Sequence, residues 1–314
     1  VQDFVGGEDA LAQHLEPRAD LPHDRRCHAD RRRAVVDDEG QVLAELAGQR
    51  VRNSAHRWAG TGAALGAIAG LIAFVPAGWL ATRVEASTGG RLLLTDARGT
   101  IWNGSALPVL TGGVGSRDAT ALPDRLYWRF GLTGLTPELR LRQACCLRGE
   151  VRARVTPGWG SISVNLLPHD STTIGQWPAG VLAGLGTPWN TLQMGGMLRL
   201  TSTGLTVESI RGRLRLTGDA TLDVVRASSR VATLDELGSY RLTVKGNAAS
   251  GDAAQVSLIT VDGALKLTGS GQWTGNGLRF RGEASAEPGS EGALNNLLNI
   301  IGKRQGASSV ISIG

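Results

Sequence analysis

Residues with the side chains to do chemistry are few in this sequence. Near the N-terminus, His14, His23 and His28 lie close to Cys27. Imidazole and thiolate groups are the usual ligands of zinc, but the spacing here is irregular, and Cys27 with His28 alone cannot complete a tetrahedral shell. We therefore expect no metal site and no cofactor in this segment.

A second group has the chemistry of a hydrolase triad, because His169, Asp170 and Ser171 are consecutive. Neighbouring side chains on an extended chain point apart, whereas a triad is assembled in space from distant segments. The sequence also contains no P-loop, GxSxG or HExxH pattern. We therefore expect no catalytic residues and a protein that is not an enzyme.

The third group is the adjacent pair Cys145 and Cys146. Adjacent Cα atoms are about 3.8 Å apart, which is below the usual range for a disulfide. Three interpretations stay open: a strained vicinal disulfide, a link to another chain, and two free thiols on opposite faces of a strand. An oxidising compartment outside the cytoplasm would favour the first two.

Composition divides the chain into three parts. Residues 1–57 are polar and dense in charge, residues 58–82 carry no charge, and residues 83–314 are rich in glycine and poor in aromatics. The first part is either a disordered tail or the product of a start site assigned too early. The net charge of +5 comes mostly from arginine, without a basic cluster interleaved with aromatics, so we expect no nucleic-acid partner.

The uncharged run of 25 residues at 58–82 predicts a transmembrane helix. A helix rises about 1.5 Å per residue and the hydrocarbon core is about 30 Å thick, so the run is long enough to span it. Arginines precede the run and tryptophans lie near both ends, which predicts a cytoplasmic N-terminus. A cleaved signal peptide is the alternative, but the run exceeds the usual apolar core of about 7–15 residues.

Gly62, Gly66 and Gly70 lie four residues apart in this run and would share one face of a helix. Small residues at this spacing let two membrane helices approach closely. They form a candidate helix–helix contact, although glycine is also common throughout this chain.

Residues 83–314 have the pattern of a β-rich domain. In the stretch Val151–Val155, apolar residues alternate with arginines, and period-two alternation predicts a strand with one buried and one solvated face. Similar stretches recur, and we expect turns at Thr203–Gly204, Thr217–Asp219, Asp262–Gly263 and Gly275–Gly277. Leucines at helical spacing after Ser290 predict a short C-terminal helix. The predicted fold is mainly β, a curved antiparallel sheet or sandwich-like domain behind one membrane helix.

An ordered set of motifs over about 58–314 resembles the type II secretion system protein N family. The motifs are "GTIWNGSA" (99–106), "LYWRF" (126–130), "LGSYRLTVKG" (237–246), "GALKLTGSGQW" (263–273) and the ending "ALNNLLNIIGKRQGASSVISIG" (293–314). The resemblance implies a non-enzymatic, bitopic inner-membrane protein of Gram-negative bacteria with a periplasmic domain. It implies partners among other secretion components, such as the outer-membrane secretin or the inner-membrane platform proteins. The charged segment 1–57 departs from the family pattern.

The family is also similar to AsmA-type envelope proteins, whose curved sheets are associated with lipid handling. This likeness implies an alternative function in lipid binding or transfer. It places Trp102 and Trp128 on the inner face of a curved, incompletely closed sheet. The simpler interpretation makes both tryptophans ordinary core residues of a sandwich.

Overall fold

The computed structural model describes residues 58–314 except 135, 168–171, 211–212, 247–252 and 275–276. The chain divides into two compact units, residues 1–64 and residues 65–314. In the first unit the described residues, 58–64, are helical. The second unit begins with helical residues 65–73 and contains every strand in the described part of the chain.

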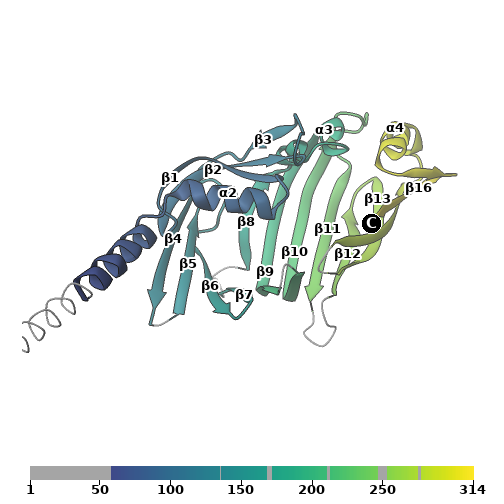
Figure 1. Ribbon diagram of the computed structural model, residues 1–314. Helices are drawn as coiled ribbons and strands as arrows, with labels where there is room; N and C mark the ends of the chain where they lie inside the picture. Colours follow the sequence, from purple (N-terminus) through teal and green to yellow (C-terminus); the bar gives the residue numbers. More distant parts are fainter. Residues whose placement is uncertain (1–57, 135, 168–171, 211–212, 247–252, 275–276) are drawn as a thin grey trace, which may run out of the picture. The chain divides into compact units, whose positions relative to one another are not determined.

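The described strands of the second unit form a single sheet of 16 members (Figure 1). Every neighbouring pair is antiparallel. The strands are β1 (Leu92–Gly99), β2 (Asn103–Thr111), β3 (Ala119–Ala121), β4 (Leu126–Thr133), β5 (Thr136–Arg142), β6 (Val151–Gly158), β7 (Ser161–Leu166), β8 (Thr173–Pro178), β9 (Met194–Ile210), β10 (Arg213–Ser229), β11 (Gly238–Gly246), β12 (Ala254–Asp262), β13 (Leu265–Trp273), β14 (Leu278–Ala286), β15 (Lys303–Gln305) and β16 (Ser308–Ile313). The predicted β class is confirmed, but a sandwich would need a second sheet, and the described strands make one.

Strand order in the sheet follows the chain with few exceptions. The path runs β1-β2-β4-β5-β6-β7-β9 to β14 in sequence, and ends with β16 and β15. The short strand β3 pairs with β2, beside β4. The long strand β9 pairs with β8 along 197–201 and with β7 along 206–210. The sheet is therefore a meander, as the short predicted connections favour.

Side-chain alternation gives the sheet two different faces. On β6, Val151 and Ala153 are buried while Arg152 and Arg154 are exposed, as the sequence predicted. The helix-covered face carries apolar side chains, including Trp128, Leu139, Ala153, Leu222, Val256 and Phe280. The open face carries polar and basic side chains, including Arg129, Arg140, Arg152, Arg241, Gln255 and Arg279.

Short helices bury the helix-covered face in three places. Helix α2 (Ala77–Ser87) packs on β1 and β2 (Figure 1), the 3-10 turn η1 (Ala179–Leu185) packs on β9, and α4 (Glu291–Ile301) packs on β14 and β16. A one-turn helix, α3 (Trp189–Leu192), follows η1. The predicted C-terminal helix is confirmed: its leucines 294, 297 and 298 are fully buried. Ser290 occupies the N-cap position without a capping hydrogen bond from its side chain.

Two predicted turns are wrong. Gly204 lies inside β9, and Gly218 lies inside β10, where each strand runs for 17 residues. Gly218 has φ +98°, and a Cβ built on it would lie 2.1 Å from the carbonyl oxygen of Gly204. The pairing register shifts between Asp219 and Thr221. Gly218 therefore permits an irregular segment in which β10 closely approaches β9, and neither glycine lies in a turn.

The apolar run at 58–82 is interrupted in the structure. Helical residues end at 73, and Pro76 adopts an extended conformation with φ −69° and ψ 149° as the N-cap of α2. Proline has no N–H to donate and clashes with the preceding turn, so a helix ends before it more readily than it continues through it. Residues 77–82 consequently belong to α2, where Ala77 is buried against the sheet.

Candidate binding surfaces

The two predicted inner-face tryptophans have different environments. Trp128 is 4% exposed and packs with Ala77 of α2 and Ala106 of β2 on the helix-covered face. Its indole N–H donates to the carbonyl oxygens of Thr100 and Ile101, at 3.3 and 3.1 Å. Trp128 is thus a core residue beneath α2.

Trp102 lies nearer the surface, because 41% of it is exposed. Its ring meets Phe130 edge to face, with centroids 6.3 Å apart. Its indole N–H donates to the carbonyl oxygen of Ile72 at 2.8 Å, and the backbone N–H of Ile101 donates to Val75. The loop around Trp102 therefore attaches the helical segment before Pro76 to the sheet.

Helical residues 65–73 present apolar side chains outward. Leu65, Ile68, Leu71 and the following Phe74 are more than half exposed. At Gly62, Gly66 and Gly70 a built Cβ has no described neighbour within 4 Å beyond its own helix and chain neighbours. None of the helices in the described part of the chain combines the length and hydropathy that crossing a bilayer requires.

Cys145 and Cys146 lie in the turn between β5 and β6, and their sulfurs are 1.99 Å apart. Gln143 fixes the start of this turn, because its side-chain amide donates to the carbonyl of Asp124 and accepts from the indole of Trp177. The backbone of the turn also bonds to β8, where Gln176 donates to the carbonyl of Cys146. The turn is therefore attached to β8 and to the loop before β4.

The two edges of the sheet differ. On β1 the register shifts between Thr95 and Arg98, and Asp96 has φ +49°. Hydrogen bonds from Arg98 and then Arg125 hold the pKa of the Asp96 carboxyl below its usual value. A charged, irregular strand of this kind disfavours pairing of the sheet edge with a further strand.

At the other edge, β15 covers only part of β16. Residues 303–305 of β15 pair with 308–310 of β16. Beyond Val310, among the described residues, Ile311–Ile313 have strand partners on the β14 side alone. The backbone of 311–313 therefore forms an open edge beside the short terminal strand β15.

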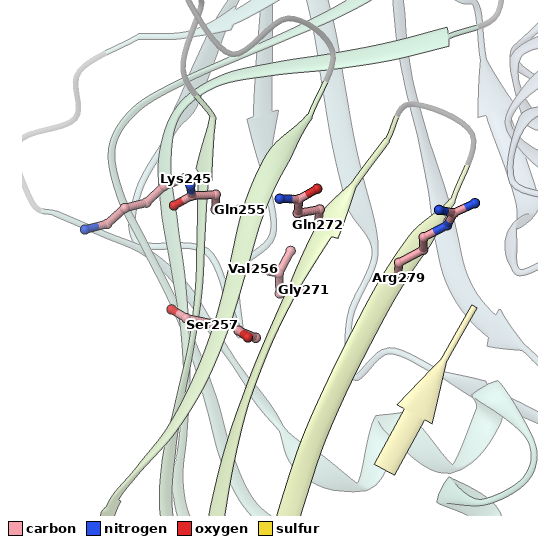
Figure 2. Close-up of a pocket in the computed structure, with 8 residues that line it drawn as sticks. Lys245, Gln255, Val256, Ser257, Gly271, Gln272 and Arg279 are labelled. Atoms are coloured by element: carbon pink, nitrogen blue, oxygen red, sulfur yellow. The ribbon is translucent and has the colours of Figure 1, made fainter. Parts of the chain in front are cut away.

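The open face of β11 to β14 holds a shallow hollow of about 620 Å³ (Figure 2). One transverse row across it consists of Lys245, Gln255, Gln272 and Arg279, which are direct partners on successive strands. In Figure 2 Lys245 extends away from the two glutamines, and Arg279 lies at the opposite end of the row. The row offers hydrogen-bond donors along a strip rather than converging on one point.

A second hollow, of about 630 Å³, lies on the open face of β4 and β5. Its lining includes Asn103, Tyr127, Arg129, Arg140, Arg142 and Glu150. Beside it, the carboxyl of Glu138 is buried. Burial would raise the pKa of this carboxyl, but hydrogen bonds from Arg140 and Thr133 outweigh burial and hold the pKa below its usual value.

Sequence reasoning missed both hollows. It placed Arg152 and Arg154 on the outward face of one strand, but alternation does not tell which residues of the neighbouring strands lie opposite. The remaining candidates, the histidines at 14, 23 and 28 with Cys27 and the run 169–171, lie outside the described residues. The described part of the chain contains no cluster of three His, Cys, Asp or Glu able to hold a metal ion.

A family model described as type II secretion system (T2SS), protein N, matches residues 90–312. The chain belongs to this family. The match extends from the edge strand β1 to β16 and so covers the whole sheet. No curated protein and no solved structure matches the chain.

Membership makes the chain a component of type II protein secretion. The family is one of secretion components associated with the cell envelope and is not known for an enzymatic activity. The family predicted from the ordered motifs is therefore confirmed, and it also suggests that the chain interacts with other parts of the secretion machinery.

Proposed function

We propose that this type II secretion protein N is a non-enzymatic, bitopic inner-membrane protein that binds other secretion components in the periplasm. The apolar residues from 58 to about 74, before α2, form the anchor, the N-terminus is cytoplasmic, and α2 and the sheet domain lie on the periplasmic side. The observation that carries the anchor is the outward-facing apolar surface of 65–74, with Leu65, Leu71 and Phe74 exposed. Large side chains of this kind favour a lipid environment over water.

Topology fusions test the anchor. A reporter active only in the periplasm, fused after Gly314, should be active, and one fused before residue 58 should be inactive. The full chain should stay in the membrane fraction after washing with alkaline carbonate. Release of the full chain by carbonate, or activity of the N-terminal fusion, would contradict the proposal.

The proposed partner surface is the open edge at Ile311–Ile313. A strand at an edge offers unpaired backbone groups to a partner strand, and the β1 edge is interrupted by its bulge. A photo-crosslinking residue at Ser312 should capture another secretion component in cells that carry the whole system. The matched control is Ser270, a serine on the central strand β13. Equal capture at both positions, or none at Ser312, would refute this assignment.

A second candidate function, lipid binding, is supported by the part of the helix-covered face that no helix buries. Val155, Val164, Val207 and Leu216 form a transverse row of half-buried apolar side chains across β6, β7, β9 and β10. Native mass spectrometry and lipid extraction on purified protein discriminate the two functions. Stoichiometric lipid would favour lipid binding, and a lipid-free mass would favour the scaffold.

We also propose that Cys145 and Cys146 form an internal disulfide. The intact mass without reductant should then be two hydrogens below that of the reduced chain, and neither thiol should react with iodoacetamide. A doubled mass would indicate a link between chains, and two alkylated cysteines would indicate free thiols.

The candidate contact through Gly62, Gly66 and Gly70 remains a proposal of helix–helix association in the membrane. A leucine in place of Gly66 should weaken self-association or partner association, because close approach depends on small residues. The matched control is Ala64→Leu, two residues away on another side of the helix. Equal effects of both substitutions would contradict a specific glycine face.

A further inference from the structure

Three arginines lie directly opposite one another on the open face. Arg129 of β4 pairs with Arg140 of β5, and Arg140 pairs with Arg152 of β6. Neighbouring strands are about 4.8 Å apart, and like charges directly opposite each other are destabilising. In the adjacent register positions, Arg142 lies opposite Tyr127 and Arg154 lies opposite Glu138. The sheet therefore concentrates arginines where pairing geometry alone disfavours them.

The chain compensates only part of this charge. Arg140 forms ion pairs with Glu138 at 2.9 Å and with Glu150 at 3.8 Å, and Arg142 forms one with Glu150 at 2.6 Å. Within the described residues, no carboxylate lies within 4.0 Å of Arg129, Arg152 or Arg154. Five arginines thus face two glutamates, which leaves three positive charges for an external anion to balance.

Arg129, which has no ion pair among the described residues, borders the hollow of about 630 Å³. Arg140 and Arg142, which are ion-paired with glutamates, line the same hollow. Glu150 holds Arg142 through two contacts to one carboxylate oxygen, which limits the conformations of that guanidinium. The lining also includes the hydrogen-bonding groups of Asn103 and Tyr127, which is half exposed, and the carboxylate of Glu150, which is engaged by Arg142. The hollow therefore combines several guanidinium groups with neutral polar groups at one place.

We propose that this hollow is a binding site for a phosphate group. Guanidinium is a planar donor that matches phosphate oxygens in pairs, and hydrogen bonds between charged partners are the strong ones. Three guanidinium groups that line one hollow suit a compact group with several oxygens better than a single carboxylate. The other hollow lacks this arrangement, since Lys245 and Arg279 stand at opposite ends of its row (Figure 2). Free phosphate and the phosphodiester of an anionic lipid headgroup present the same chemistry.

Titration of the full chain in a neutral detergent and a phosphate-free buffer tests the site. The probes are inorganic phosphate and dihexanoyl phosphatidylglycerol, a short-chain anionic lipid, followed by isothermal calorimetry and ³¹P line broadening. Saturable binding is expected for at least one probe and should weaken as salt rises. Tenfold tighter binding of the lipid would identify a headgroup site, and equal binding would identify a site for the phosphate ion itself.

Substitutions locate the site. Arg129→Gln should weaken binding roughly tenfold, because it removes a charged donor from the hollow. Arg152→Gln should weaken it less, since Arg152 lies beside the hollow without lining it. The matched control is Arg279→Gln, an exposed arginine on the same face in the other hollow, which should change binding less than twofold.

Thermal melts of the three variants check that the fold is unchanged. These surface arginines have no ion pair among the described residues, so the melting temperatures should stay close to that of the parent. Equal losses of binding for Arg129→Gln and Arg279→Gln would show a general charge effect and overturn the proposal. Failure of both probes to bind the parent protein would overturn it as well.

Discussion

Replacing Trp128 with phenylalanine removes an indole N–H that holds two backbone carbonyls beneath α2. The donor contacts the oxygens of Thr100 and Ile101 at 3.3 and 3.1 Å, and the ring is 4% exposed. The same loop carries Trp102, whose N–H donates to Ile72 and whose ring is 41% exposed. The two substitutions therefore remove the same group from a buried and from a partly solvated position.

The expected loss in the free energy of unfolding differs between the two substitutions for two reasons. At Trp128 the net loss of a hydrogen bond is about 1 kcal/mol, and the smaller phenyl ring buries roughly 40 Å² less apolar surface, worth about 1 kcal/mol more. Trp128→Phe should therefore lower the free energy of unfolding by about 2 kcal/mol. At Trp102 water can replace the lost donor and the ring is already partly exposed, so Trp102→Phe should lower it by less than about 1 kcal/mol.

Urea unfolding of the full chain in detergent, followed by the far-ultraviolet circular dichroism of the sheet, measures both losses. Circular dichroism is preferable to fluorescence because each variant removes a fluorophore. The slope of free energy against urea should be the same for all three proteins, so that midpoints compare stabilities. Equal losses for the two variants, or a loss below about 0.5 kcal/mol for Trp128→Phe, would refute the assignment of Trp128 to the core.

Other predictions concern the strands, the C-terminal helix and acid stability. Gly218→Ala should destabilise by about 2 kcal/mol or more, because φ is +98° and the Cβ would meet a carbonyl oxygen; Gly204→Ala, with open space at its Cβ, should change the urea midpoint little. Leu298→Ala, at a fully buried site, should lower the free energy of unfolding by about 3 kcal/mol. Ile300→Ala, at a side chain that is 37% exposed, should lower it by about 1 kcal/mol or less. Urea midpoints measure both losses. The pKa of Glu138 in the folded state lies below its usual 4.5. The contribution of this carboxylate to the free energy of unfolding is therefore fully present above pH 4.5 and is lost as the pH falls through the lower folded-state pKa. Between pH 6 and 3, the urea midpoint of Glu138→Gln should fall less than that of the parent.

Local patterns in the sequence were enough to find most elements. Alternation in 151–155 identified β6 and both of its faces, since side chains two residues apart on a strand always share a face. The spacing of leucines 294, 297 and 298 identified α4 and its buried side. In both cases the periodicity of a single element carries the information, and no knowledge of its neighbours is needed.

Features that depend on two strands could not be predicted in this way. Gly204 and Gly218 resemble turn residues in isolation. Their places inside two paired strands follow from the register, which sets Gly218 opposite Leu205 and brings it close to the carbonyl oxygen of Gly204. The arginine row has the same origin, because the register between β4, β5 and β6 decides that Arg129, Arg140 and Arg152 align. The distinct environments of the two tryptophans likewise depend on where α2 packs.

The near-sequential order of the strands in the sheet also bears on the order in which they can pair during folding. In the topology proposed above, the N-terminal end is anchored in the membrane and β1 emerges first, so in this meander most strands pair with one that has already emerged. Closing each short loop costs little entropy, so the sheet can grow strand by strand without waiting for the C-terminus. The newest strand is then always the exposed edge. Assembly ends when α4 docks its buried leucines and β15 covers part of β16, which leaves residues 311–313 as the last edge of the finished sheet.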